Sequence, residues 1–291
     1  MTPSWLYAPL SLQIIRVVML RNGLVEGIPY SLSRWTDISS KWAWFEACLD
    51  SKKMVAFDPR TSAPGVWSLS PEDTLGLVFW TKDPTALIQN RARLAPYDVT
   101  VHVTATGWAE VEKGTPSIEE AGQLLVRTAQ AFRKTYWRFS PIPILPDAEL
   151  LRRFQKLLGF AAIAGIKQTF VSFLQENDKL PENRTPESRF ALLNSLADMA
   201  HAFGVQVVLC RDDRTFEGWS GAQFTTEACV QPADFGGQVP LEDCGCVLMV
   251  DPFTINEACS FGCHYCYASD KSLSAKKRNT TRTTRSLHVV R

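Results

Sequence analysis

The chain has 291 residues, 45% of them hydrophobic and 21% charged, and its formal net charge is +1 at pH 7. This length and composition suit one large domain or two small ones. The near-neutral charge excludes a strong positive electrostatic potential over the whole protein, of the kind that attracts nucleic acid or an anionic membrane. Eight cysteines are too few for a disulfide scaffold, and five of them lie between residues 244 and 266. Such clustering is typical of a metal or redox site in a cytoplasmic protein.

The two ends of the chain differ from the rest. Residues 1–24 are expected to be an N-terminal extension, because Pro9 and Arg16 interrupt an apolar run that faintly resembles a signal peptide. No run of about 18 uncharged apolar residues occurs, so we expect no membrane span. Residues 271–291 are rich in lysine and arginine and are expected to form a disordered basic tail, with a phosphate-binding arm as the alternative.

Short apolar runs alternate with longer helical patterns between residues 25 and 250. Strands are expected at residues 27–33, 54–57, 74–80, 99–106, 137–140, 168–173 and 205–210. Helices are expected at residues 39–50, 85–93, 117–132, 147–164 and 186–203. Thr185 and Pro186 suit the N-cap and first position of the last helix, and Gly204 suits its C-terminal end.

This alternation predicts parallel βαβ units and an α/β fold, a complete or partial (β/α) TIM-like barrel, in a single domain over residues 25–270. A doubly wound open sheet is the alternative, although no GxGxxG or P-loop motif follows an expected strand. Residues 211–242, rich in Gly, Asp and Thr, are expected to be an irregular loop packed over the end of the barrel.

Charged residues follow several of the expected strands. Arg34 and Asp37 follow the first, Lys82 follows the strand at 74–80, and Arg138 lies in the strand at 137–140. Because active-site residues of a barrel emerge where strands end, these side chains are expected to converge on one mouth and to bind a carboxylate or phosphate. Ion pairs that merely close the barrel are the alternative. His102 is either a core histidine or a catalytic base.

The motif Cys259-x3-Cys263-x2-Cys266 has an aromatic residue, Tyr265, before its last cysteine. Three thiolates at this spacing can hold a [4Fe–4S] cluster that keeps one iron open for another ligand. Structural zinc is the alternative, with Cys244, Cys246 or His264 completing four ligands, and unligated thiols are the third reading. The spacing is similar to that of radical S-adenosylmethionine (SAM) enzymes, in which the open iron chelates SAM.

Five motifs in order resemble the family known as domain of unknown function 1848 (DUF1848). They are SRWTDI at residues 33–38, VFWTKDP at 78–84, WRFSP at 137–141, CGC at 244–246 and C-x3-C-x2-CYA at 259–268. The resemblance covers roughly residues 30–270, and a weaker one links the FWTK segment to spore photoproduct lyase relatives. Trp35, Ser140 and the Val-Gln-Pro after Cys229 depart from the family pattern, which puts the usual specificity in doubt.

The resemblance implies a bacterial or archaeal, cytoplasmic, iron–sulfur enzyme of the radical SAM type. Its metal ligands would be Cys259, Cys263 and Cys266, with a [4Fe–4S] cluster and SAM as cofactors and a flavodoxin- or ferredoxin-like electron donor. Tyr267, Lys82 and Arg138 would contact the cofactor, and Arg34, Asp37, Lys82 and Arg138 would line the catalytic mouth. The rival function is a non-catalytic zinc- or iron–sulfur-binding protein, associated with nucleic acid through its basic tail.

Overall fold

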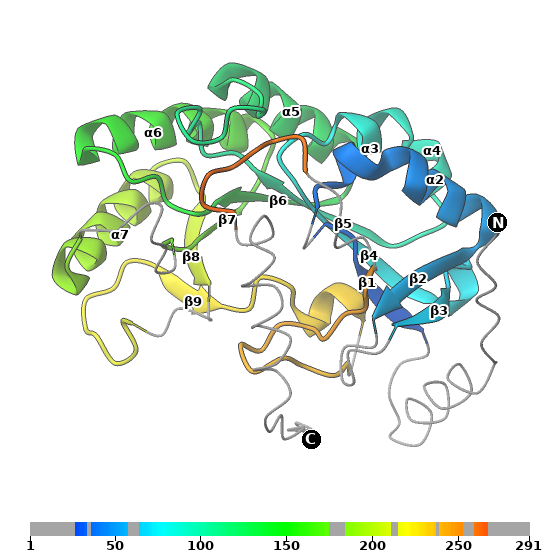
Figure 1. Cartoon of the computed structure of the whole chain (residues 1–291). Helices are drawn as coiled ribbons and strands as arrows, with labels where there is room; N and C mark the ends of the chain where they lie inside the picture. Colours follow the sequence, from blue (N-terminus) through cyan, green and yellow to red (C-terminus); the bar gives the residue numbers. More distant parts are fainter. Residues whose placement is uncertain are drawn as a thin grey trace.

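A computed structural model describes residues 27–33, 36–57, 64–174, 184–210, 215–236, 239–252 and 259–266. Seven parallel strands form one sheet in the order β1-β4-β5-β6-β7-β8-β9. The strands are β1 (Ile28–Ser31), β4 (Thr74–Thr81), β5 (Val99–Thr104), β6 (Lys134–Phe139), β7 (Gln168–Val171), β8 (Gln206–Cys210) and β9 (Thr225–Glu227). Because β1 and β9 stay at opposite edges, the sheet is a partial barrel, and the predicted α/β barrel-like fold is confirmed (Figure 1).

Helices connect the strands and cover one face of the sheet (Figure 1). They are α2 (Trp42–Ser51), α3 (Thr85–Gln89), α4 (Arg91–Leu94), α5 (Ile118–Ala131), α6 (Asp147–Ile163) and α7 (Pro186–His201). The described residues also form three short 3-10 helices, η1 (Ile38–Lys41), η2 (Pro71–Asp73) and η3 (Pro232–Phe235), and η3 does not belong to this helical layer. Ser117 and Glu120 form a capping box that starts α5. Thr185 caps α7 as predicted, and Gly204 adopts a left-handed φ of +67° after it.

The helix predicted at residues 85–93 is divided in two. Asn90 ends α3, where both its backbone N–H and its side-chain amide donate to the carbonyl of Ala86. An asparagine side chain that competes in this way for a backbone carbonyl weakens helix continuation.

The main hydrophobic core lies between the sheet and the helices. Trp137 and Phe139 of β6 are fully buried there, and Trp137 stacks on Phe154 of α6 with ring centroids 5.1 Å apart. Because side chains alternate along a strand, the residues between them face the other side of the sheet. On that inner face His102 lies between Trp80 and Tyr136, with ring centroids 5.7 and 5.0 Å away.

Residues 228–236 and 239–250, which we call the covering segment, lie against this inner face (Figure 1). Val230, Phe235 and Val247 are buried against Val78 of β4. A Cβ atom added to Gly76 would lie 2.6 Å from the Phe235 ring, so the segment and the strand are in close contact. The apolar side chains of the segment thus bury the face that the helices leave uncovered.

Two expectations need correction. Residues 211–242 were expected as irregular loop over the barrel end, but the described part of this stretch contains β9 and η3, and its later half covers the inner face. The strand expected at residues 54–57 does not join the barrel. It forms β2 (Lys53–Phe57), which pairs antiparallel with β3 (Pro64–Ser68) and β10 (Asp251–Pro252) in a separate sheet.

No helix in the described part of the chain is long and apolar enough to cross a membrane. The N-terminal extension (1–24), the basic tail (271–291), Arg34, Trp35 and Tyr267 lie outside the described residues. The expectations for them stay predictions, as does the single-domain boundary.

Candidate functional site

The cysteine loop, residues 259–266, is attached to the β5–α5 loop by two backbone hydrogen bonds. Gly114 N–H donates to the carbonyl of Phe261 at 3.2 Å, and His264 N–H donates to the carbonyl of Val111 at 3.0 Å. The β5–α5 loop follows the carboxyl end of β5, so the cysteines lie at the end of the sheet where barrel active sites form.

A third attachment joins the cysteine loop to η1. The hydroxyl groups of Ser40 and Ser260 lie 2.7 Å apart, and the Ser260 N–H donates to Ser40 Oγ at 3.1 Å. The cysteine loop is thus held by two segments that follow different strands, β1 and β5.

A buried ion pair lies directly beneath the cysteine loop. Lys82 Nζ donates to Glu112 Oε1 at 2.8 Å and to the hydroxyl of Tyr265 at 3.1 Å. Tyr265 also donates to Glu112 Oε1, and Thr106 Oγ1 donates to Glu112 Oε2 at 2.8 Å. The Lys82 and Glu112 side chains are only 14% and 3% exposed. Tyr265, the aromatic residue inside the cysteine motif, therefore ties the loop to a charged pair in the protein interior.

Stacking and burial fix Tyr265 in this position. Its ring stacks on Trp108, with centroids 5.6 Å apart and planes 16° from parallel. Burial raises the pKa of Tyr265, and the Glu112 carboxylate and neighbouring Cys263 raise it further. The phenol is therefore protonated at neutral pH and acts as a hydrogen-bond donor.

Asp37 holds the end of β4 rather than facing open solvent. Its carboxylate accepts from Thr81 Oγ1 and from the backbone N–H of Lys82, both at 2.8 Å. It also caps η1 by accepting from the N–H and hydroxyl of Ser39 at 3.0 and 2.9 Å. Burial raises the pKa of Asp37 and these hydrogen bonds oppose the rise. With its acceptors engaged in this way, Asp37 positions Lys82.

The cysteine thiols of the loop influence one another. Burial raises the pKa of Cys263 to about 11, with Lys82 opposing this effect and Glu112, Cys266 and Cys259 adding to it. Cys263 is therefore a thiol at neutral pH in the absence of metal. A metal centre would displace this proton, because the thiolate is the metal ligand.

The three cysteines of the loop match the donor set of two kinds of metal centre in number or type. A [4Fe–4S] cluster with one open iron needs three thiolates from the protein, whereas structural zinc needs a fourth ligand. Within the described residues, no three His, Cys, Asp or Glu side chains converge closely enough to hold one metal ion, and this holds for the cysteine loop as well.

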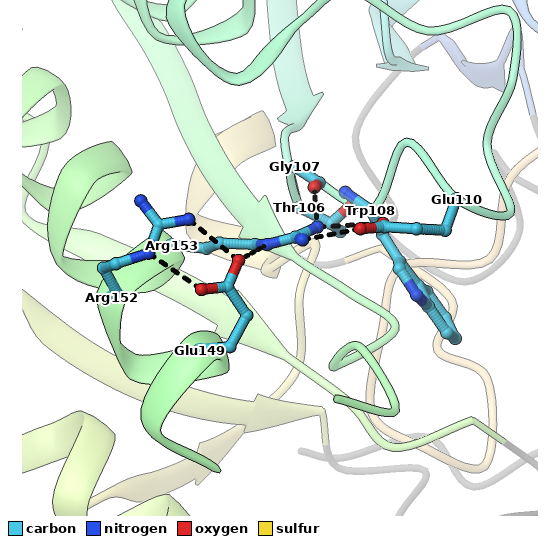
Figure 2. A network of polar contacts seen from close by, with 7 residues as sticks. All are labelled: Thr106, Gly107, Trp108, Glu110, Glu149, Arg152 and Arg153. Atoms are coloured by element: carbon cyan, nitrogen blue, oxygen red, sulfur yellow. Dashed lines mark hydrogen bonds and ion pairs between the residues drawn. The ribbon is translucent and has the colours of Figure 1, made fainter. Parts of the chain in front are cut away.

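An arginine on α6 anchors the loop that carries Glu112. Figure 2 shows Arg153 reaching the carbonyl of Gly107 at 2.5 Å and both carboxylate oxygens of Glu110 at 2.9 and 2.6 Å. Glu149, bound in turn by Arg152, accepts from Arg153 Nε at 2.6 Å. The bidentate geometry fixes the start of the β5–α5 loop and hence the platform beneath the cysteines.

One glycine makes the close approach of the two loops possible. A Cβ atom on Gly114 would lie 2.5 Å from the carbonyl oxygen of Ser260 and 2.8 Å from Phe261 Cα. Both are backbone atoms, so a side-chain rotation cannot relieve the clash. We expect Gly114→Ala to displace the cysteine loop and to lower the iron bound per chain after anaerobic reconstitution. Gly159→Ala on α6, where a Cβ meets nothing within 4 Å, is the control. Equal iron content in both variants would show that this docking is not needed.

The described residues predicted to line one mouth of the barrel lie in two separate places in the structure. Asp37, Lys82 and Cys263 come together as described, whereas Arg138 interacts with His102 and Cys229 on the inner face. Burial and then Arg138 lower the pKa of His102 to about 3, so the imidazole is neutral. His102 is thus a buried aromatic of the inner face rather than a proton carrier at neutral pH.

Glu112 was not predicted as a site residue, and Tyr265 was predicted no role beyond its place in the cysteine motif. Glu112 lies in a βα loop well beyond its strand, and only the fold shows that it meets Lys82. The position of Tyr265 within the cysteine motif was the available signal for that residue. A cavity of about 630 Å³, lined in part by Tyr97, Asp98 and Arg133, lies at the amino ends of β5 and β6, away from this site.

The family described as domain of unknown function (DUF1848) matches residues 30–268, most of the chain. The chain belongs to the DUF1848 family. This confirms the resemblance, and the matched range contains all five motifs, from the SRWTDI segment to the CYA after the second cysteine of the loop. No curated protein matches this DUF1848 chain.

Solved structures resemble the DUF1848 chain only remotely. D-psicose 3-epimerase from Clostridium cellulolyticum H10 with D-tagatose is 13% identical, with 88% of this chain and 96% of that chain covered and a TM-score of 0.40. Streptococcus suis SuiB bound to S-adenosylmethionine is 8% identical, with 97% and 75% covered and a TM-score of 0.37. A sugar phosphate isomerase/epimerase from Parabacteroides distasonis is 10% identical, with 45% and 49% covered and a TM-score of 0.30. The chain spans about half the length of that last protein, and likenesses this weak say nothing about chemistry.

Proposed function

We propose that this DUF1848 protein is a radical SAM enzyme whose cluster is held by the cysteine loop. The observation that carries the proposal is the loop itself: three thiols at CxxxCxxC spacing, docked at the carboxyl end of a parallel partial barrel. Barrel active sites form at that end, and a three-cysteine cluster leaves one iron available for a ligand.

Cys259, Cys263 and Cys266 would hold the cluster. A [4Fe–4S] cluster held by these residues would leave one iron open for SAM and would supply one-electron chemistry toward a C–S bond of the sulfonium. The chain contributes the setting for that chemistry. Lys82 lies close enough to Cys263 to favour its thiolate form, and Tyr265 fixes the loop over the Lys82–Glu112 pair.

Lys82 is suited to bind an anionic group at this site. An ammonium group has three N–H donors, and those found among the described residues go to Glu112 and Tyr265. The remaining donor is available for a carboxylate of SAM or of the substrate. Asp37 would act as a positioning residue, since it binds the Lys82 backbone N–H rather than its ammonium group.

The other predicted contacts stay predictions. Arg138 lies on the inner face near Cys229, and Arg34 and Tyr267 fall outside the described residues. A flavodoxin- or ferredoxin-like donor would supply the electron. The residues of the site do not distinguish between classes of substrate.

Anaerobic purification tests the proposal directly. We expect a brown protein with broad visible absorbance, about four iron atoms and acid-labile sulfide per chain, and reductive cleavage of added SAM. A colourless protein with stoichiometric zinc would overturn the proposal and leave the non-catalytic metal-binding function. Iron–sulfur absorbance without any SAM cleavage under strong reduction would retain the cluster and reject the enzyme.

A further inference from the structure

Four cysteines outside the cysteine loop gather at the inner face of the sheet. Cys210 ends β8, and Cys229, Cys244 and Cys246 belong to the covering segment. Cys246 is 5% exposed, whereas the other three are partly exposed. The proposed cluster uses none of them, so their proximity calls for a separate explanation.

Two of these thiols are in direct contact. The sulfur atoms of Cys229 and Cys246 lie 3.5 Å apart. The following residues, Val230 and Val247, are joined by a backbone hydrogen bond of 3.0 Å, so the two stretches of main chain run side by side. A disulfide bond of about 2.05 Å would require the sulfur atoms to approach by roughly 1.5 Å, a side-chain adjustment with little backbone movement.

The environment makes the two thiols chemically different. Hydrogen bonds with Cys210 and Cys246 hold the pKa of Cys229 well below its usual range, and the positive charge of Arg138 adds to this effect. Hydrogen bonds with Cys229 and Cys244, together with burial, raise the pKa of Cys246. Cys229 is therefore the more acidic thiol of the pair, and Cys246 is the one that keeps its proton more readily.

The polar groups around the pair support this assignment. Arg138 Nη1 is buried and has no hydrogen-bond partner among the described residues, and the positive charge of this guanidinium favours the thiolate form of Cys229. His102 is neutral, and its two ring nitrogens also have no partner in the described part of the chain. Reactive cysteines occur in such electropositive and partly exposed surroundings.

We propose that Cys229 and Cys246 form a redox-active thiol pair that small hydroperoxides oxidise to a disulfide. The Cys229 thiolate attacks one peroxide oxygen, the O–O bond breaks, and the leaving hydroxide takes a proton to become water. The sulfur of Cys246 then attacks the resulting Cys229 sulfenic acid, and its proton leaves with the hydroxyl group as a second water. Two thiols and one hydrogen peroxide thus yield one disulfide and two waters, and a dithiol reductant reverses the oxidation.

The observations favour a thiol pair over a second metal site. Cys229 and Cys246 bring two sulfur atoms within 3.5 Å, which is all that a disulfide requires. Cys210 and Cys244 extend the set through hydrogen bonds to Cys229 and Cys246, so a shared metal ion is the alternative that the test below must distinguish. The proposal does not rest on SAM chemistry, because it shares no cysteine with the loop at residues 259–266.

Peroxide titration with disulfide mapping tests the pair. The full chain and a Cys259→Ala/Cys263→Ala/Cys266→Ala variant, in which no loop cluster can form, are treated anaerobically with one equivalent of hydrogen peroxide and analysed by mass spectrometry. We expect a Cys229–Cys246 disulfide in both proteins, reversed by dithiothreitol. Cys246→Ser should leave a sulfenic acid on Cys229 that dimedone traps, whereas Cys244→Ser should still form the disulfide. Arg138→Met should shift the pH at which oxidation reaches half its maximal rate to higher pH, because the positive charge of Arg138 lowers the pKa of Cys229.

Three results would overturn the proposal. One is oxidation of Cys229 no faster than that of the buried Cys48 in folded protein, with folding verified by circular dichroism. Another is a disulfide that uses Cys210 or Cys244 instead. The third is a stoichiometric metal ion in the triple variant that is lost in Cys229→Ser, which would identify a metal site. Because the triple variant carries no loop cluster, failure here leaves the proposed SAM chemistry unaffected.

Discussion

Cys263→Ala is expected to abolish cluster binding and to reduce SAM cleavage to the level seen without protein. Cys263 is the central cysteine of the motif, and negative charge on Cys259 and Cys266 raises its pKa. A cluster held by only three protein ligands cannot lose one and remain bound at the same site. Iron content, visible absorbance and the products of reduced SAM are measured on the anaerobically reconstituted variant.

Ser260→Ala is the matched control, because it alters the same loop without removing a ligand. Its side chain is exposed, and the Ser260 N–H still donates to Ser40 Oγ after the change, so the attachment to η1 is kept and we expect iron binding close to that of the unaltered chain. Full iron occupancy and SAM cleavage in Cys263→Ala would contradict the assignment of the cluster to this loop.

Glu112→Gln is expected to lower the free energy of unfolding by about 3 kcal/mol, because it leaves the Lys82 ammonium buried without its counter-charge. The pair is separated by 2.8 Å and almost fully enclosed. The substitution also removes the carboxylate that Tyr265 and Thr106 share, which loosens the cysteine loop. Denaturant unfolding followed by circular dichroism on the metal-free chain measures the change without interference from a cofactor.

Two comparisons make this result specific. Glu110→Gln neutralises a neighbouring glutamate that is 53% exposed and paired with Arg153, and we expect it to cost less than about 1 kcal/mol. Lys82→Met combined with Glu112→Gln should be less destabilising than the sum of the two single changes, since no buried charge is then left alone. An additive double variant would mean that the two side chains do not interact.

Periodicity was sufficient to predict much of the sheet. The strands at residues 74–80, 168–173 and 205–210 agree closely with β4, β7 and β8, because central parallel strands are continuous apolar runs bounded by helices. The strand at residues 54–57 was also recognised, but its partners were not. Antiparallel pairing with β3 and β10 involves residues far apart in sequence, and a local pattern contains no information about them.

The site residues with a local sequence pattern were predicted, and those defined by long-range contacts were not. The three cysteines and Lys82 were identified because their spacing and their position after a strand are local features. Glu112 was missed because its role comes from contact with Lys82 and Tyr265, 30 and 153 positions away in the chain. Arg138 was expected beside Lys82, but its side chain interacts instead with Cys229 of the covering segment.

The sequence by itself determined the family, the parallel α/β architecture and the three-cysteine motif, since each depends on residue types at short, fixed spacings. Only the tertiary structure decided that the cysteine loop lies on the β5–α5 loop over a buried ion pair. The structure alone likewise brought Cys229 against Cys246 under the sheet. The contact between these two cysteines accompanies the packing of the covering segment on the inner face, which buries apolar surface, and such long-range burial has no local signature in the chain.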